Sequence, residues 1–269
     1  MKIAAFGLSD VGKQRQKNED SFLVKNDLSL FAVCDGMGGH QGGDYASLEA
    51  VDILEEIVST IEKDPKKALE GANELNPDDF PSRLKYALKL ASRKIYEKSV
   101  SNAELKGMGT TAVVLYFRNN KVYIANVGDS RAYRVRSGRI VQITTDHSLV
   151  NEQLKAGVIT KEEARGHKLK NIITRSVGFQ QDVEVDVDVR AVLKEDLFIL
   201  CSDGLSNMLP DNEIMKITKG ENDLAVICRK LIDLANEKGG DDNITAVVVR
   251  VDELDEMKEG DVEDSTVEA

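Results

Sequence analysis

Four aspartates lie beside apolar runs that are typical of buried strands. They are Asp35 after the run 30–34, Asp129 after 125–127, Asp203 after 197–201 and Asp242 before 244–251. A carboxylate that leaves a buried strand costs free energy unless something neutralises it. Several converging carboxylates repel one another unless a cation lies between them. One Asp-Gly pair is usually only a turn, but four aspartates at corresponding positions predict a shared site.

Oxygen ligands without an accompanying set of histidines or cysteines favour a hard divalent cation, Mg²⁺ or Mn²⁺. A competing motif lies at Gly7–Lys13, which fits the GxxxxGK pattern of a P-loop that follows a strand. However, Gln14 stands where a Ser or Thr should reach Mg²⁺, and residues 15–20 offer no apolar face for the required helix. A P-loop nucleotide-binding protein is therefore a disfavoured alternative.

Composition limits the classes of partner. The 269 residues carry a formal net charge of −11, and the stretch from Asp252 to the end has nine acidic residues and one lysine. The body is therefore close to neutral and has no basic patch for nucleic acid. No segment approaches the ~20 apolar residues of a membrane span. With three cysteines and no CxxC pair, we expect a soluble cytoplasmic protein with reduced, buried thiols.

Hydrophobic periodicity supplies the elements that must position these residues. Strands are predicted over 2–8, 21–25, 30–34, 111–117, 121–127, 132–135, 140–143, 183–189, 197–201 and 244–251. Helices are predicted over 45–61, 84–100 and 223–238, with two short helices in 150–166. The acids at 184, 186 and 188 alternate with valines and are expected to face water. Runs of strands interrupted by helix pairs indicate antiparallel sheets covered by helices.

A series of short motifs occurs in a fixed order along the chain. They are Ser9-Asp10-x-Gly12-x-x-Arg15-x-x-Asn18-Glu19-Asp20, Asp35-Gly36-Met37-Gly38-Gly39-His40, Gly109-Thr110-Thr111, Gly128-Asp129-Ser130-Arg131, Ser202-Asp203-Gly204 and Asp242-Asn243. In this order and spacing they resemble the metal-dependent protein serine/threonine phosphatase family (protein phosphatase type 2C), in its bacterial single-domain form. The resemblance spans about residues 3–251.

The resemblance implies an α+β fold, a four-layer α-β-β-α sandwich of two antiparallel sheets flanked by helix pairs. The catalytic domain would cover 1–252, with a flap subdomain at about 145–180. Residues 253–269 are acidic and poor in apolar side chains, so they are predicted to be a disordered tail. His147 and His167 border the flap and are expected to be surface or flap-packing residues.

The resemblance also implies the site. Two Mn²⁺ or Mg²⁺ ions, with a weaker third, would be held by Asp35, Gly36 through its carbonyl, Asp203, Asp242 and Asp129. Glu19 and Asp20 would act through bound waters. Arg15 would bind the substrate phosphate, because a planar guanidinium suits two phosphate oxygens. Asn207 stands where many relatives carry another aspartate, which weakens the prediction of the third ion.

The implied reaction is hydrolysis of phosphoserine and phosphothreonine by attack of a metal-bridging hydroxide. His40 is the candidate general acid, although its position differs from that of the histidine in animal members. The substrates would be phosphoproteins, targets of a bacterial-type serine/threonine kinase, and the enzyme a monomer. The alternative is a catalytically inactive phosphopeptide-binding module, which would be expected to lack some of the metal ligands present here.

Overall fold

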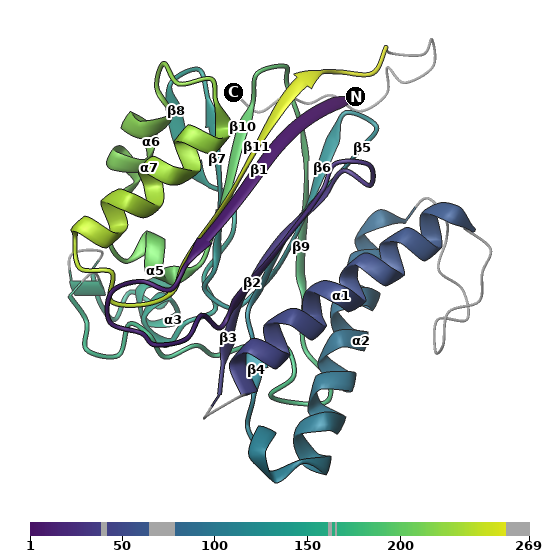
Figure 1. The fold of residues 1–269 in the computed structure, drawn as a ribbon, viewed down its shortest axis with the longest axis vertical. Helices are drawn as coiled ribbons and strands as arrows, with labels where there is room; N and C mark the ends of the chain where they lie inside the picture. Colours follow the sequence, from purple (N-terminus) through teal and green to yellow (C-terminus); the bar gives the residue numbers. More distant parts are fainter. Residues whose placement is uncertain (39–41, 65–78, 161–162, 165, 257–269) are drawn as a thin grey trace.

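The computed structural model describes residues 1–38, 42–64, 79–160, 163–164 and 166–256. Two antiparallel sheets lie face to face in it (Figure 1). The first has the order β1 (Lys2–Asp10), β11 (Ile244–Glu253), β10 (Leu197–Cys201), β7 (Arg131–Arg136) and β8 (Arg139–Gln142). The second has the order β2 (Asp20–Lys25), β3 (Leu30–Met37), β5 (Ala112–Arg118), β6 (Lys121–Val127) and β9 (Asp186–Ala191), with β4 (Gly109–Thr110) paired to β3.

Helices cover the outer face of each sheet. The pair α1 (Gly42–Lys63) and α2 (Phe80–Ser101) packs on the second sheet, and α6 (Asp211–Thr218) and α7 (Leu224–Glu237) pack on the first. The short helices are η1 (Ala103–Leu105), α3 (Leu149–Lys155) and α5 (Asp203–Ser206). The predicted four-layer α-β-β-α sandwich is confirmed. None of the described helices has the length and hydrophobicity that a membrane span requires.

The core has three layers of apolar side chains, one between the two sheets and one between each sheet and the helices that cover it. Strand β10 shows how one strand serves two of them, because successive side chains point to opposite faces. Phe198 and Leu200 pack between the sheets, where the Phe198 ring meets Phe117 edge-on at 5.3 Å. Ile199 and Cys201 point the other way, against the α7 layer. All five residues of β10 are buried, as the unbroken apolar run predicted.

Several predicted boundaries were wrong. The strand predicted over 183–189 forms ladder pairs only from Asp186, although Val183 and Val185 are buried beneath the helices. The helices α5 and α6 were not predicted, since neither reaches the length at which periodicity is readable. Of the two short helices predicted in 150–166, the structure defines α3, while part of the second lies outside the described residues. The acids at 184, 186 and 188 are exposed, as expected.

The structure of the N-terminal segment is incompatible with a P-loop. Gly7 lies inside strand β1 and pairs with Val247 of β11, so no phosphate-binding loop can begin there. Residues 11–19 form turns and bends, and no helix occurs before α1 among the residues that the structure describes. Lys13 and Gln14 instead donate backbone hydrogen bonds to the carbonyl of Gly240, which ties this loop to the start of β11.

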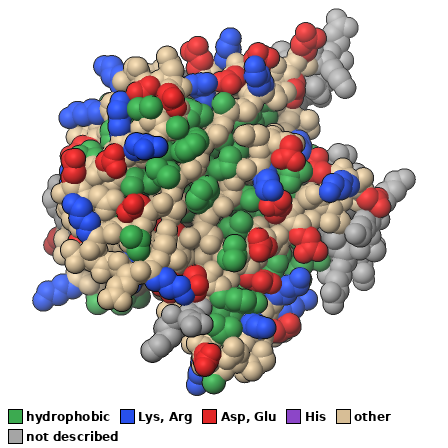
Figure 2. Space-filling view, in the orientation of Figure 1, with side chains coloured by type: hydrophobic (Ala, Val, Ile, Leu, Met, Phe, Trp, Pro, Cys, Tyr) green, Lys and Arg blue, Asp and Glu red, His purple; other side chains and the backbone are tan. Residues whose placement is uncertain are grey.

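The open edge of the sandwich is apolar. Strands β1 and β2 are the edge strands of the two sheets and lie side by side (Figure 1). Figure 2 shows a band of hydrophobic side chains on this face of the molecule. Phe22 is 36% exposed, and its ring covers Gly7, where an added Cβ would lie 2.5 Å from a ring carbon. Glycine therefore lets one aromatic ring close the gap between the two edges.

The chain remains attached to the body beyond the predicted domain end at 252. Strand β11 continues to Glu253, and Asp255 exchanges two hydrogen bonds with Asn120, at 2.8 and 3.0 Å. Asp255 also forms an ion pair with the amino group of Met1. The disordered tail was predicted over 253–269; Glu253 and Asp255 contact the body, while 257–269 lie outside the described residues. The division into a domain and a tail stays a prediction.

Two truncations test where the domain ends. Removing residues 257–269 should leave the melting temperature and the hydrolysis of a small phosphate ester unchanged. Truncation after Asp252 also removes the Asp255 contacts and should cost about 1–2 kcal/mol, at about 0.5–1.5 kcal/mol per hydrogen bond. That loss corresponds to a fall of a few degrees in melting temperature, measured by calorimetry. Equal melting temperatures for the two truncated proteins would contradict a stabilising role for Asp255.

Candidate metal centre

Asp35 is held in place by its backbone. It lies near the end of β3, and its N–H donates to the hydroxyl of Thr111 at 2.9 Å. Its carbonyl accepts the Thr111 N–H and the Thr110 hydroxyl, each at 2.9 Å. The Gly-Thr-Thr motif therefore fixes the end of β3 without using the carboxylate of Asp35. That carboxylate stays available for another partner.

Asp20 lies opposite Asp35 in the β2–β3 ladder and is anchored by two hydroxyls. Its Oδ2 accepts hydrogen bonds from Ser202 at 2.8 Å and Thr245 at 2.6 Å, while its Oδ1 is buried without a partner. Burial raises the pKa of Asp20 to about 7, and the nearby charges of Asp203 and Asp242 add to the rise. An orphaned buried carboxylate oxygen is the kind of group that a cation or water satisfies.

Asp242 lies two residues before the last strand, and its neighbour Asn243 connects three segments of the chain. The Asn243 amide donates to the carbonyls of Val11 and Lys17, both at 2.9 Å, and its oxygen accepts the N–H of Glu19 at 2.8 Å. Gly12 completes this packing. Its φ is +78°, and an added Cβ would lie 2.1 Å from the Asp242 carbonyl oxygen. The Asp-Asn motif thus fixes the loop that carries Arg15.

Arg15 reaches the acidic cluster from the surface. Its Nη2 lies 2.7 Å from Oδ2 of Asp242, and its side chain is 51% exposed. Asp242 is 227 residues away in sequence. The guanidinium therefore stands at the edge of the cluster, with donors left over for a second anion.

Asp203 and Asp129 complete the cluster from two other loops. Asp203 begins α5, accepts a hydrogen bond from the Asn207 amide at 3.0 Å, and has its pKa raised by burial and by Asp242. Burial raises the pKa of Asp129 to about 7, with a further contribution from Asp203. A hydrogen bond of 2.7 Å between Ser130 and Thr111 connects the Asp129 turn to the residues that hold Asp35.

These five aspartates form one electrostatic cluster. Burial raises the pKa of Asp35 well above its ordinary value, and Asp20, Asp203, Asp129 and Asp242 all raise it further. Among the residues that the structure describes, no three acidic, histidine or cysteine side chains form a ready-made ligand set for a metal ion. The effect of the other four carboxylates on the pKa of Asp35 places the five aspartates in one region, and their assignment as ligands stays a prediction. Their chemistry fits a hard divalent cation, which would offset their mutual repulsion.

Glu19 and Gly36 lie against the start of α1. The Gly36 N–H donates to the Glu19 carbonyl at 3.1 Å, and an added Cβ on Gly36 would lie 2.1 Å from the Gly43 carbonyl oxygen. The Glu19 carboxylate packs on Gly43, and burial raises its pKa. This close packing of the backbone accounts for the glycine after Asp35. His40, the candidate general acid, lies outside the described residues.

Three neutral residues that hold the cluster were not among the predicted site residues. Ser202, Thr245 and Asn243 have no charge and were noted only as motif letters or strand residues, yet they bind the Asp20 carboxylate and the Arg15 loop. The available signal was their position within three residues of a candidate ligand. His147 was expected at the surface or in flap packing. It is buried, with 5% of its surface exposed, and contacts the turn before Asp129.

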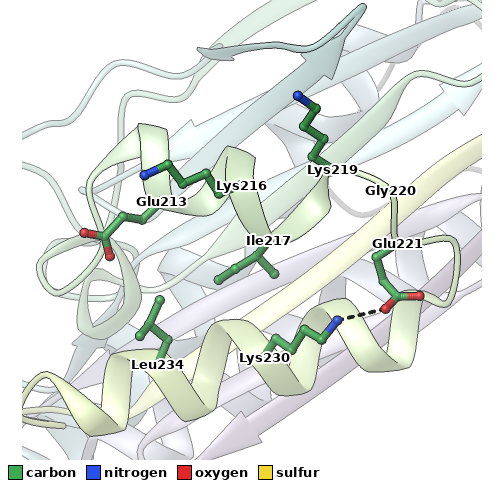
Figure 3. Close-up of a pocket in the computed structure, with 8 residues that line it drawn as sticks. All are labelled: Glu213, Lys216, Ile217, Lys219, Gly220, Glu221, Lys230 and Leu234. Carbon is green, nitrogen blue, oxygen red and sulfur yellow. Dashed lines mark hydrogen bonds and ion pairs between the residues drawn. The ribbon is translucent and has the colours of Figure 1, made fainter.

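A cavity of about 640 Å³ opens beside Asp129 and Asp203. Lys155 and Lys170 line it together with the acids, and Arg131 is paired within it to Asp146 at 2.7 Å. A second groove, of about 450 Å³, lies between α6 and α7 (Figure 3). It has an apolar floor and a rim ion pair between Lys230 and Glu221 at 2.9 Å, and none of the five clustered aspartates lines it.

The fold and the acidic cluster have counterparts in known proteins. Residues 4–158 match the profile of the protein phosphatase 2C family. Serine/threonine phosphatase stp of Listeria monocytogenes is 38% identical over 247 residues, which cover 91% of this chain and 94% of that protein. Stp1 of Staphylococcus aureus is 34% identical, with a TM-score of 0.83 over 94% of this chain and 96% of that one.

A third relative was solved with metal. The catalytic domain of PstP, in complex with two manganese ions, is 31% identical, with a TM-score of 0.80 over 93% of this chain and 99% of that one. The fold and site define a phosphatase of the α-β-β-α type. The chain belongs to the protein phosphatase 2C family and is a serine/threonine protein phosphatase.

The raised pKa values predict how metal and pH act together. Asp20 and Asp129 titrate near 7 in the folded protein against an ordinary 3.8. Between about pH 4 and 7 the folded state binds more protons than the unfolded one, so the contribution of these groups to stability falls as pH rises. Mn²⁺ competes with those protons, so its stabilisation should grow with pH.

At a hundredfold excess over Kd, Mn²⁺ should stabilise the protein by about 2.7 kcal/mol, or about 5–10 °C in melting temperature. We expect this shift at about pH 8 and a much smaller one at about pH 5, measured by calorimetry. The Asp203→Asn variant is the control and should show a reduced shift at both pH values. The same Mn²⁺-induced shift at both pH values in the wild type would contradict the proton competition.

Proposed function

We propose that the acidic cluster is a two-metal centre for hydrolysis of phosphoserine and phosphothreonine in proteins, with Mn²⁺ or Mg²⁺ bound by Asp35, the Gly36 carbonyl, Asp203 and Asp242. Asp129 would hold a weaker third ion, and Glu19 and Asp20 would act through water. The observation that carries this proposal is the burial of Asp35 among four other aspartates. The two manganese ions in the PstP complex support it.

When bound, the ions supply charge neutralisation at the phosphate and activation of water for attack at phosphorus. The residues of the chain would orient the metal ligands and bind the substrate. Arg15 would bind the phosphate in exchange for its contact with Asp242, since its exposed guanidinium already reaches the edge of the cluster. Thr245 and Ser202 keep Asp20 in one orientation through their hydroxyls. His40 remains the proposed acid for the leaving group.

The cavity beside Asp129 and Asp203 would receive residues that flank the phosphorylated side chain. Its lining carries both signs of charge, including Lys155, Lys170 and Asp211. We further infer that the substrates are products of a bacterial-type serine/threonine kinase and that the enzyme acts as a monomer. A cytoplasmic location is supported by its three cysteines, which are free and buried.

Replacement of the ligands tests the centre. Asp35→Asn, Asp203→Asn and Asp242→Asn should each lower kcat for para-nitrophenyl phosphate at least about a hundredfold, because each removes part of the charge that holds the ions. Asp233→Asn, at an exposed position on α7, is the matched control and should keep full activity. Near wild-type kcat at saturating Mn²⁺ in any of the three variants would remove that residue from the ligand set.

A separate prediction concerns Arg15. Arg15→Ala should raise KM about tenfold with a smaller fall in kcat, as expected for loss of one charge-assisted contact worth about 1.5–3 kcal/mol. Arg15→Lys should recover little, because an ammonium cannot bind two oxygens in a plane. Lys13→Ala, in the same loop, is the control. If Arg15 only restrains Asp242, the variant would lose Mn²⁺ affinity while KM at saturating Mn²⁺ stayed unchanged.

A further inference from the structure

His147 binds both backbone groups of one glycine. Its backbone N–H donates to the Gly128 carbonyl at 2.9 Å, and its ring Nδ1 accepts the Gly128 N–H at 3.1 Å. Asn126 adds a longer bond to the same carbonyl at 3.4 Å. Because Gly128 is buried, these contacts replace the hydrogen bonds that water would otherwise supply.

Gly128 has little freedom of its own to adopt another conformation. Its φ is +102°, and an added Cβ would lie 2.6 Å from the methyl carbon of Thr111. Asp129 follows directly, so the orientation of the Gly128 peptide units sets the direction in which the Asp129 side chain leaves the backbone. The two bonds between His147 and Gly128 therefore act on the placement of Asp129, a proposed metal ligand.

The His147 ring is oriented from its other side. Since Nδ1 accepts a hydrogen bond, the neutral ring carries its proton on Nε2, which lies 3.1 Å from Oδ2 of Asp186. Arg175 donates from Nη1 to Oδ1 of Asp186 at 2.9 Å. Its Nη2 forms an ion pair with Oε2 of Glu184, also at 2.9 Å. The carbonyl of His147 accepts the Thr174 N–H at 2.8 Å. Thus β9 and the segment around Arg175 fix the ring that fixes Gly128.

We propose that His147 is a positioning residue for Asp129, acting through Gly128. The proposal rests on the proposed function, in which Asp129 contributes to the weaker metal site. Groups that orient a metal ligand commonly change metal affinity about 10–100-fold when they are replaced. A residue that served only to fill space would affect stability without distinguishing between its two ring nitrogens.

Two isosteric variants separate the two sides of the ring. In His147→Asn the side-chain oxygen can stand in for Nδ1 and accept the Gly128 N–H, but nothing reaches Asp186. In His147→Gln the side-chain amide can stand in for Nε2 and donate to Asp186, but the Gly128 N–H loses its partner. Both variants remove the imidazole ring, so packing losses are shared. His167→Ala, at a position whose hydrogen bond to Leu169 is exposed, is the control.

Mn²⁺ binding by the metal-free full chain is measured by calorimetry and by electron paramagnetic resonance. We expect the weakest site to lose about tenfold or more in affinity in His147→Gln and less than about threefold in His147→Asn. Asp129→Asn should abolish that site. Equal losses of affinity in the Asn and Gln variants, or no loss in either, would overturn the positioning role and leave His147 as a packing residue.

Hydrogen exchange of the Gly128 amide gives a readout that needs no metal. It should be faster in His147→Gln than in His147→Asn, with the exchange of His167→Ala equal to wild type. If the wild-type protein binds no Mn²⁺ at all, the proposed function fails, and this exchange still decides whether His147 holds the turn. Equal exchange of Gly128 in the Asn and Gln variants would overturn the proposal.

Discussion

Bringing several carboxylates together beneath the surface costs free energy twice, because each loses water and each feels the charge of the others. In this protein Asp20, Asp35, Asp129 and Asp203 all bear that cost, as the upward direction of their pKa values shows. The sandwich can tolerate the cluster because it lies where strands end and loops meet, partly open to solvent. A divalent cation is the natural counter-charge for such a group.

Neutral polar residues make this arrangement rigid. Thr111 binds the backbone of Asp35 and the hydroxyl of Ser130, so one side chain connects two of the loops that carry aspartates. Ser202 and Thr245 converge on Asp20 from the opposite sheet. These hydroxyls satisfy backbone groups and Oδ2 of Asp20, and they leave Oδ1 of Asp20 without a partner. A site that binds ions benefits from ligands held by groups that do not compete for the ion.

Apolar packing fixes the relative position of the two sheets, and thereby the distance across the cluster. Asp35 and Asp20 come from the second sheet, while Asp203 and Asp242 follow or precede strands of the first. Side chains such as Phe198 and Val247 fill the space between the sheets. Changes in this layer would therefore act on the site without touching it, since close-packed cores transmit displacement. The surface groove between α6 and α7 lies outside this arrangement.

The sequence alone determined the strands, the main helices and the candidate ligands. Apolar runs such as 197–201 predict buried strands, and an aspartate beside four of these runs marks a carboxylate that must find a counter-charge. The ordered motifs then indicated the family, which the comparisons confirmed. Short helices such as α6 were missed, because one or two turns leave no readable period.

Only the tertiary structure decided which residues meet. Arg15 pairs with Asp242 across 227 positions, and Thr245 reaches Asp20 across 225. Nothing in the local sequence of His147 indicated that a histidine at the border of a loop would be buried against Gly128 and face Asp186. Burial and hydrogen-bond partners depend on how distant strands register and pack. Hydrophobic periodicity specifies which face of an element is apolar, and it does not specify the partner across the gap.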